Sequence, residues 1–170
     1  IETGAVICGS LLLKESTGFT NSLIWMPPDG NLKRYVKRHV FSMGGEDEKI
    51  RVGKEQLIVE LNGWKIKPMV CYDLRFPVWS KNRYEAGLFE YDLAIYVANW
   101  PAVRSYPWNI LLKARAIENQ SYVLGVNRVG KDGLGNQYDG FSKLIDAKGK
   151  IISESPQGKE AVKRCLLSWD

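Results

Sequence analysis

Residues 57–77, LIVELNGWKIKPMVCYDLRFP, carry the strongest structural signal in the chain. An Asn-Gly pair at 62–63 separates two runs that are rich in β-branched and apolar residues, and both members of such a pair readily adopt the positive φ angles of a type I′ turn. We therefore predict a hairpin with strands over residues 57–61 and 64–72. Cys71 falls near the end of the second strand.

Strand and helix patterns extend outward from this hairpin in both directions. Residues 5–13 and 22–26 have the apolar, partly β-branched composition of strands. Hairpins followed by strand–helix–strand alternation predict an α+β fold, with mixed sheets and helices packed outside them. The elements expected after the hairpin are a helix over 77–86 that Gly87 ends, a strand over 93–98, a helix over 107–119, a strand over 122–126, and a second hairpin of residues 141–146 and 151–154.

The whole chain is expected to fold as one domain. No internal repeat, low-complexity tract or linker divides residues 1–170, and a composition that is 45% hydrophobic and 25% charged is sufficient for one sizeable core. The helix predicted over residues 107–119 has one apolar face at helical spacing. This face consists of Ile110, Leu111, Ala114 and Ile117.

The charge pattern argues against a nucleic-acid partner. The net charge of +5 is spread along the chain, and the one dense basic cluster consists of Lys33, Arg34, Lys37 and Arg38. Such a cluster is either an anion-binding patch or an ordinary solvated face, and we favour the solvated face. No apolar run approaches the length of a membrane span, so we expect no membrane partner.

The cysteine content indicates a reducing environment. Cys8, Cys71 and Cys165 lie at wide spacings, which makes a poor disulfide framework. With His39 as the sole histidine, they do not form a zinc site either. We therefore expect a cytoplasmic protein without a metal or a cofactor, in which Cys8 and Cys165 are buried structural thiols.

Cys71 is a candidate nucleophile because of its position. It ends a strand just before the entry to a helix, and open α/β sheets place their ligand sites past the carboxyl ends of strands. The thiolate is the reactive form of cysteine, and nearby cations favour it. The alternative is that Cys71 is a small buried hydrophobic residue, and position alone favours this alternative.

Four segments of the sequence change this balance, because together they resemble the nitrilase superfamily of carbon–nitrogen hydrolases. Residues 65–77, KIKPMVCYDLRFP, resemble the cysteine motif of the amidase branch, and residues 35–41, YVKRHVF, resemble the lysine motif. NWP at 99–101 and ARAIENQ at 114–120 match the downstream pattern of the family. The resemblance spans nearly the whole chain and implies a four-layer αββα sandwich.

The resemblance implies a role for each of four residues. Cys71 would be the nucleophile, and Lys37 would be an ammonium beside the thiolate and the developing oxyanion. The backbone N–H of Tyr72 would be the second oxyanion donor, and Glu46 would orient the lysine and contact the substrate. Without the resemblance, Lys37 is an ordinary lysine at a strand end, and Glu46 belongs to an acidic turn of the usual solvated kind.

Within the superfamily, the sequence is most similar to omega-amidases, which hydrolyse the terminal amides of small dicarboxylic acids such as α-ketoglutaramate and succinamate to an acid and ammonia. Arg75 and Arg104 are candidates to hold the substrate carboxylate, since guanidinium groups bind carboxylates in bidentate fashion. A structural ion pair is the alternative for each. Asn99 and Trp100 are candidates for the pocket wall, although an aromatic residue beside a strand end is more often part of the core.

Two other functions stay open at this point. A nitrilase-branch enzyme would act on carbamyl or nitrile substrates, whereas a pseudoenzyme would keep the fold and bind a partner through its basic face. Members of the family usually dimerise through surfaces such as the helix at 107–120. A homodimer or a larger homo-oligomer is therefore expected.

One part of the family pattern does not match any residue of the chain. The catalytic glutamate of the family lies well before the lysine motif, and Glu2 is too close to Lys37 to correspond to it. Glu15 does not correspond either, because it follows a strand that the family places after the glutamate. We therefore expect an αββα sandwich that is incomplete at both ends, with the general base in a segment before residue 1.

Overall fold

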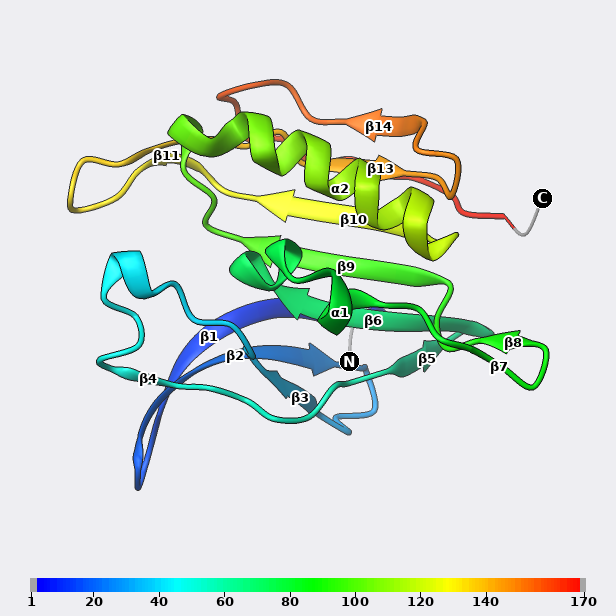
Figure 1. Cartoon of the computed structure of the whole chain (residues 1–170), viewed down its shortest axis with the longest axis horizontal. Helices are drawn as coiled ribbons and strands as arrows, with labels where there is room; N and C mark the ends of the chain where they lie inside the picture. The colour runs from blue at the N-terminus through cyan, green and yellow to red at the C-terminus, as the bar shows by residue number, and fades with distance from the viewer. Residues whose placement is uncertain (1–2, 169–170) are drawn as a thin grey trace.

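The chain folds into two main β-sheets, with helices on the larger one (Figure 1). The computed structural model describes residues 3–168, so Glu2 lies outside the described part. The larger sheet has the strand order β14-β13-β10-β9-β6-β5, and the smaller sheet has the order β1-β2-β3 with β4 beside β2. Strands β6, β9 and β10 are parallel neighbours, as strand–helix–strand alternation predicts.

The predicted strands are present, with boundaries that differ by a few residues. The smaller sheet contains β1 (Ile7–Glu15), β2 (Gly18–Met26), β3 (Lys33–Val36) and β4 (Ile50–Arg51). The larger sheet contains β5 (Val59–Leu61), β6 (Trp64–Val70), β9 (Leu93–Ala98), β10 (Tyr122–Asn127), β13 (Lys143–Ile145) and β14 (Ile151–Glu154). Two short hairpins are formed by β7 (Tyr84–Glu85) with β8 (Leu88–Phe89) and by β11 (Val129–Lys131) with β12 (Gln137–Asp139). The helices are α1 (Pro77–Ser80), α2 (Ser105–Asn119) and the 3-10 helices η1 (Ser42–Gly44), η2 (Cys71–Arg75) and η3 (Ala102–Arg104).

Strands β5 and β6 form the predicted hairpin. Asn62 and Gly63 have φ angles of 51° and 82°, as a type I′ turn requires. Strand β6 ends at Val70, because Cys71 turns the chain with a φ of 47° and begins η2. Non-glycine residues with positive φ are uncommon, and strained backbone is found preferentially at functional sites. Cys71 therefore lies on the turn after the strand and not within the strand.

The predicted helix over residues 77–86 is wrong beyond its first turn. Helix α1 ends at Ser80, and the chain then forms the β7–β8 hairpin. The buried Asn82 side chain accounts for this difference. Its amide donates to the carbonyls of Tyr91 at 2.7 Å and Asn119 at 3.1 Å, and its oxygen accepts the Tyr91 N–H at 3.0 Å. These contacts with distant residues extend the chain where the local pattern continues a helix.

Helix α2 is confirmed, but it packs through a different face from the predicted one. Ile110 and Ile117 are 48% and 54% exposed, whereas Trp108 and Leu112 are buried against the larger sheet. A Cβ atom on Gly125 of β10 would lie 2.6 Å from Leu112 Cδ1 and 2.8 Å from Trp108 Cζ2. Glycine at this position therefore allows α2 to approach β10 closely. Of the predicted apolar stripe, Ile110 and Ile117 face outward, whereas Leu111 packs against the core.

The layers of the molecule agree with part of the predicted sandwich. One continuous core joins the two sheets, and β2 of the smaller sheet contacts β6 of the larger one. Helix α2, the larger sheet and the smaller sheet form three layers, so the mixed α/β architecture is confirmed. A fourth, helical layer is not among the elements of residues 3–168 and stays a prediction.

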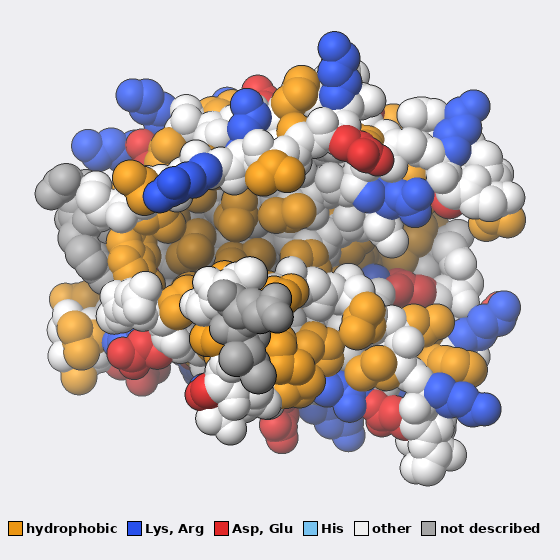
Figure 2. Space-filling view, turned by 180° about the vertical axis from the view of Figure 1, so that it is seen from behind, with side chains coloured by type: hydrophobic (Ala, Val, Ile, Leu, Met, Phe, Trp, Pro, Cys, Tyr) orange, Lys and Arg blue, Asp and Glu red, His pale blue; other side chains and the backbone are white. Residues whose placement is uncertain are grey.

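Apolar surface is exposed on the side of the larger sheet away from the viewer in Figure 1. Figure 2 shows a hollow with hydrophobic side chains on this side of the molecule. A groove of about 430 Å³ in the larger sheet is lined by residues that include Leu93, Leu124, Val126 and Leu144. Within residues 3–168, none of the helices has both the length and the apolar character that crossing a membrane requires.

Candidate active site

A cavity of about 410 Å³ is lined by all eight of the predicted site residues. It lies past the carboxyl ends of β6 and β9, at the place where an α/β sheet is expected to bind its ligand. The predicted residues that line it are Lys37, Glu46, Cys71, Tyr72, Arg75, Asn99, Trp100 and Arg104. The two sheets and the loops between them thus bring together residues that are up to 67 positions apart (Lys37 to Arg104, 104 − 37).

Cys71 lies between the ends of two parallel strands. Val70 pairs with Val97 across β6 and β9, so the residues that follow the two strands are neighbours. The Cys71 sulfur is 3.8 Å from the carbonyl oxygen of Asn99. Cys71 and Tyr72 are the first residues of η2, where backbone N–H groups have no partner within the helix. The Tyr72 N–H is therefore in a position of the kind that oxyanion holes use.

The surroundings of Cys71 favour the thiol over the thiolate. Burial raises the pKa of Cys71 above its usual value, and the charges of Glu46 and Asp73 act in the same direction. The Lys37 ammonium and a hydrogen bond from the backbone at Asn99 oppose this shift without cancelling it. Since the thiolate is the nucleophile, a reaction at Cys71 requires a base to remove this proton.

Lys37 and Glu46 form a close ion pair in the cavity wall. Lys37 is 2% exposed, and its Nζ is 2.5 Å from Glu46 Oε2. The Glu46 carboxylate also accepts the Phe41 N–H at 2.6 Å and the Asn21 amide at 3.3 Å. Although burial opposes the shift, these hydrogen bonds and the charge of Lys37 lower the pKa of Glu46. Glu46 is therefore not a solvated residue of an acidic turn, and Lys37 is not an ordinary lysine at a strand end.

The backbone around Lys37 is held between the two neighbouring chain segments. Its N–H donates to the Asn21 carbonyl at 2.9 Å, and its carbonyl accepts the Gly53 N–H at 2.9 Å. A Cβ atom at Gly53 would lie 2.1 Å from the Val36 carbonyl oxygen, so glycine is required for this approach.

The two candidate arginines contact aromatic rings. The Arg75 guanidinium lies 5.2 Å from the centroid of the Trp100 ring, and that of Arg104 lies 5.0 Å from the centroid of the Phe41 ring. Within residues 3–168, neither forms an ion pair with a carboxylate. The structural ion pair considered for each from the sequence is therefore absent from this part of the chain. Both cations stay available to an anionic group in the cavity.

Trp100 belongs to the core and to the cavity wall at the same time. It is 3% exposed, its indole N–H donates to the Arg104 carbonyl at 2.7 Å, and its ring packs on Trp108. The backbone of Trp100 is bonded to the buried Asn127 side chain, which accepts its N–H at 2.8 Å and donates to its carbonyl at 3.0 Å. Asn127 thereby fixes the loop that carries Asn99.

Several cavity residues were not predicted from the sequence. Ser10 and Asn21 come from the β1–β2 hairpin, and Leu134, Asn136 and Tyr138 come from the β11–β12 hairpin. The turn-forming composition of residues 132–136 indicates a loop, but nothing local connects that loop to Cys71. These residues reach the cavity through tertiary contacts alone.

The basic cluster of the sequence is divided among different surroundings in the described part of the chain. In the basic cluster, Arg34 pairs with Glu15, Arg38 donates to the Gly53 carbonyl, and Lys37 is buried in the cavity wall. The cluster is therefore not one continuous basic face. The prediction that Cys165 is buried is wrong, since it is exposed in the C-terminal stretch after β14, whereas Cys8 is partly buried.

The chain belongs to a hydrolase family, and its fold is that of a solved member. The family model described as "Carbon-nitrogen hydrolase" matches residues 2–164. A crystal structure of a CN-hydrolase superfamily protein from Xanthomonas campestris, with an arsenic adduct in its active site, is 47% identical to this chain. Its TM-score is 0.91, and the match covers 93% of this chain and 60% of that one.

Curated relatives are similar across the same region. "Omega-amidase YafV" of Yersinia enterocolitica is 50% identical over 170 residues, which is 100% of this chain and 64% of that protein. "2-oxoglutaramate amidase" of Bacillus subtilis is 32% identical over 150 residues, which is 88% of this chain and 56% of that protein. The chain therefore spans between 56% and 64% of the length of these two relatives.

Proposed function

We propose that the protein is a cysteine-dependent amidase that hydrolyses the terminal amide of a small dicarboxylic acid. The observation that carries this proposal is the composition of one cavity, which is lined by Cys71, the Lys37–Glu46 pair and two arginines. Neither arginine has a carboxylate partner among residues 3–168. The names of the relatives, an omega-amidase and a 2-oxoglutaramate amidase, support the same class of substrate.

The reaction follows from the chemistry of these groups. A base takes the proton of Cys71, and the sulfur attacks the amide carbonyl to form a tetrahedral oxyanion. Lys37 Nζ and the Tyr72 N–H stabilise this oxyanion, a type of interaction that contributes about 3–4 kcal/mol per donor in a site that excludes water. The protonated base then delivers its proton to the leaving nitrogen, and ammonia departs to leave a thioester. Water attacks the thioester with the help of the same base and releases the carboxylic acid.

Glu46 is a poor choice for this base. Among the described residues it is the one carboxylate that lines the cavity, but its oxygens are occupied by Lys37 and the Phe41 N–H, and its pKa is lowered. A carboxylate with a lowered pKa is a weak base. We therefore assign Glu46 to the orientation of Lys37 and not to proton transfer.

The two arginines are the reason that we propose a preference of the protein for amides that carry a carboxylate. A substrate whose amide carbon reaches Cys71 would place its distant carboxylate near Arg75 or Arg104, both of which line the cavity. We favour Arg104, which lies at the start of α2 beside the Asn99–Trp100 loop. A hydrogen bond to a charged group contributes about 1.5–3 kcal/mol, or roughly tenfold or more in affinity.

The test is ammonia release from succinamate and α-ketoglutaramate, with butyramide as an uncharged amide of similar length. We expect turnover of the charged amides and none with Cys71→Ala. Arg104→Ala is expected to raise KM about tenfold for succinamate and to leave KM for butyramide unchanged. An unchanged KM for succinamate would show that Arg104 does not bind the carboxylate. Turnover of nitriles or carbamyl compounds in preference to amides would favour the nitrilase-branch alternative.

We also propose that the protein forms a homodimer through the outer face of α2. This face exposes Tyr106 (77%), Ile110 and Ile117, and Val103 of the preceding η3 is 88% exposed, so together they form a large apolar surface. Sedimentation at micromolar concentration tests it, because a monomer would exclude this interface. The free thiols of Cys8, Cys71 and Cys165 support a location in the reducing cytoplasm.

A further inference from the structure

Asp73 is a buried carboxylate two residues after the candidate nucleophile. It is 0% exposed, and it does not line the cavity. Its Oδ1 accepts the His39 backbone N–H at 2.9 Å and lies 2.9 Å from His39 Nδ1. Its Oδ2 accepts the Tyr35 hydroxyl at 2.7 Å and the Val70 N–H at 3.1 Å. A buried carboxylate is costly unless such contacts satisfy it, so this position is strongly specified.

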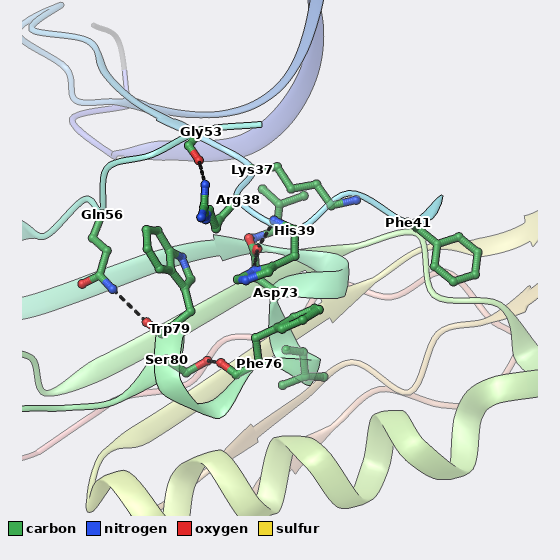
Figure 3. Close-up of polar contacts among 12 residues, drawn as sticks. Lys37, Arg38, His39, Phe41, Gly53, Gln56, Asp73, Phe76, Trp79 and Ser80 are labelled. Atoms are coloured by element: carbon green, nitrogen blue, oxygen red, sulfur yellow. Dashed lines mark hydrogen bonds and ion pairs between the residues drawn. The ribbon is translucent and has the colours of Figure 1, made fainter. Parts of the chain in front are cut away.

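These partners lie on both sides of Lys37 in the sequence. Tyr35 precedes Lys37 by two residues and His39 follows it by two, while Val70 and Asp73 flank Cys71. One carboxylate therefore joins the segment that carries the lysine to the turn that carries the cysteine. Figure 3 shows Asp73 against the segment of Lys37, Arg38 and His39.

The contacts around Asp73 make this link rigid. The His39 ring stacks on the Phe76 ring, with centroids 3.6 Å apart and an interplanar angle of 7°. The Tyr35 hydroxyl that donates to Asp73 also accepts the Trp79 indole N–H at 3.0 Å and the Arg38 N–H at 3.3 Å. Residues 35–39 are thus fixed against η2 and α1 by several groups, and Asp73 forms hydrogen bonds with both ends of this segment.

We propose that Asp73 is the positioning residue that sets the distance between Lys37 and Cys71. It acts through Tyr35 and His39 and does not touch the substrate, whereas Glu46 fixes the direction of the Lys37 side chain through its ion pair with Lys37 Nζ. The same contacts engage His39, the sole histidine, in the support of Lys37. This inference rests on the proposed amidase function for its kinetic test but not for its chemical one.

The kinetic test compares Asp73→Asn with the wild type and with Lys37→Met in the whole protein. Asparagine keeps the size of the side chain but places N–H groups opposite the donors of Tyr35 or His39. A shift of about 1 Å in a catalytic group costs on the order of 100-fold in rate. We therefore expect kcat for succinamate to fall by roughly that factor while KM changes little, since transition-state stabilisation is lost and ground-state binding is not.

A double variant distinguishes positioning from an independent effect. If Asp73 acts through Lys37, the variant with both substitutions is no slower than Lys37→Met alone. If the rate reductions of the two single variants multiply in the double variant, the proposal is overturned. Tyr35→Phe provides a milder perturbation, since it removes one of the bonds to Asp73, and we expect it to lower kcat to an intermediate value with KM unchanged.

A chemical test uses the pH dependence of Cys71 alkylation by iodoacetamide, followed by mass spectrometry of the Cys71 peptide. Three charged groups act on the thiol: Lys37 favours the thiolate more strongly than Asp73 opposes it, and Glu46 also opposes it. Loss of the Asp73 charge alone would move the alkylation midpoint to lower pH. Displacement of Lys37 moves it to higher pH, and this is the direction that we expect for both Asp73→Asn and Lys37→Met.

Asp92→Asn is the matched control for a general loss of stability. Asp92 also accepts a backbone N–H of β6, from Lys65 at 2.8 Å, but at the opposite end of the strand from Cys71. We expect this variant to keep the wild-type kcat and alkylation midpoint. A midpoint for Asp73→Asn that falls or stays constant would overturn the positioning role. Absence of turnover by the wild type, together with a raised midpoint for Asp73→Asn, would overturn only the amidase function.

Discussion

Replacement of Lys67 by methionine is expected to remove a pH dependence from the stability of the protein. Lys67 lies on β6, four residues before Cys71, and is 1% exposed. Its Nζ donates to Gln56 Oε1 at 2.9 Å and is 3.8 Å from Glu90, the one carboxylate within ion-pair distance among residues 3–168. These contacts compensate only part of the burial, which lowers the pKa of Lys67 from 10.5 to about 8.

The sign of the effect follows from this shift. Below pH 8 Lys67 is charged in both the folded and the unfolded chain, and burial of the charge reduces the free energy of unfolding. Between pH 8 and 10.5 the folded protein loses this proton while the unfolded chain keeps it, so stability rises with pH. A shift from 10.5 to about 8 corresponds to roughly 2 kcal/mol gained between pH 7 and pH 9.5.

The assay is urea unfolding of the wild type and Lys67→Met at pH 7 and pH 9.5. The loss of the Gln56 hydrogen bond contributes equally at both pH values. The difference in the free energy of unfolding between wild type and Lys67→Met therefore changes with pH only through the titration of Lys67. Lys67→Arg is the matched control: a guanidinium stays protonated over this range, and its pH dependence should follow that of the methionine variant. A difference between wild type and Lys67→Met that is constant with pH would refute the reasoning.

Three further substitutions test other contacts. Glu46→Gln keeps a partner for Lys37 but removes the negative charge, so kcat should fall about tenfold while the alkylation midpoint of Cys71, whose pKa Glu46 raises, moves to lower pH. Gly125→Val should lower the free energy of unfolding by about 1–3 kcal/mol or more, measured by urea denaturation, because its Cβ would overlap Leu112. Asn127→Ala leaves the backbone groups of Trp100 without partners, and calorimetry should show a loss of about 2–3 kcal/mol.

Local signals in the sequence predicted the elements that local chemistry determines. The turn at Asn62 and Gly63 requires positive φ at both residues, which few other pairs tolerate, and the hairpin was predicted correctly. The predicted helix over residues 77–86 is wrong beyond its first turn because Asn82 forms its hydrogen bonds with Tyr91 and Asn119. No local pattern shows these contacts. Where a side chain bonds to distant backbone, the tertiary contact decides the structure.

The face of α2 illustrates a second limit of the sequence. Trp108 and Leu112 lie on one side of this helix and Ile110 and Ile117 on another, and both stripes have helical spacing. Periodicity does not distinguish a stripe that packs on the domain from one that faces outward. The stripe with Trp108 and Leu112 packs on the sheet because Gly125 of β10, an element outside the helix, leaves room for these two side chains.

The candidate site was predicted through resemblance, and the contacts that organise it were not. All eight predicted residues line one cavity, whereas Asp73 was passed over although it lies two residues from Cys71. A carboxylate in a polar turn has the same local appearance whether it is solvated or buried. Its four hydrogen bonds to Tyr35, His39 and Val70 exist only in the folded chain.

The charges in the cavity explain why the proposed reaction depends on a separate base. Lys37 alone would favour the Cys71 thiolate, but its close pair with Glu46 is neutral as a unit, and burial holds the pKa of the thiol above its usual value. These surroundings favour the thiol, which is less reactive than a thiolate toward oxidants and alkylating agents. When a substrate carbonyl becomes an oxyanion, its new negative charge lies beside the Lys37 ammonium, so the pair stabilises the transition state more than the resting state. Catalysis then requires proton removal and oxyanion stabilisation together.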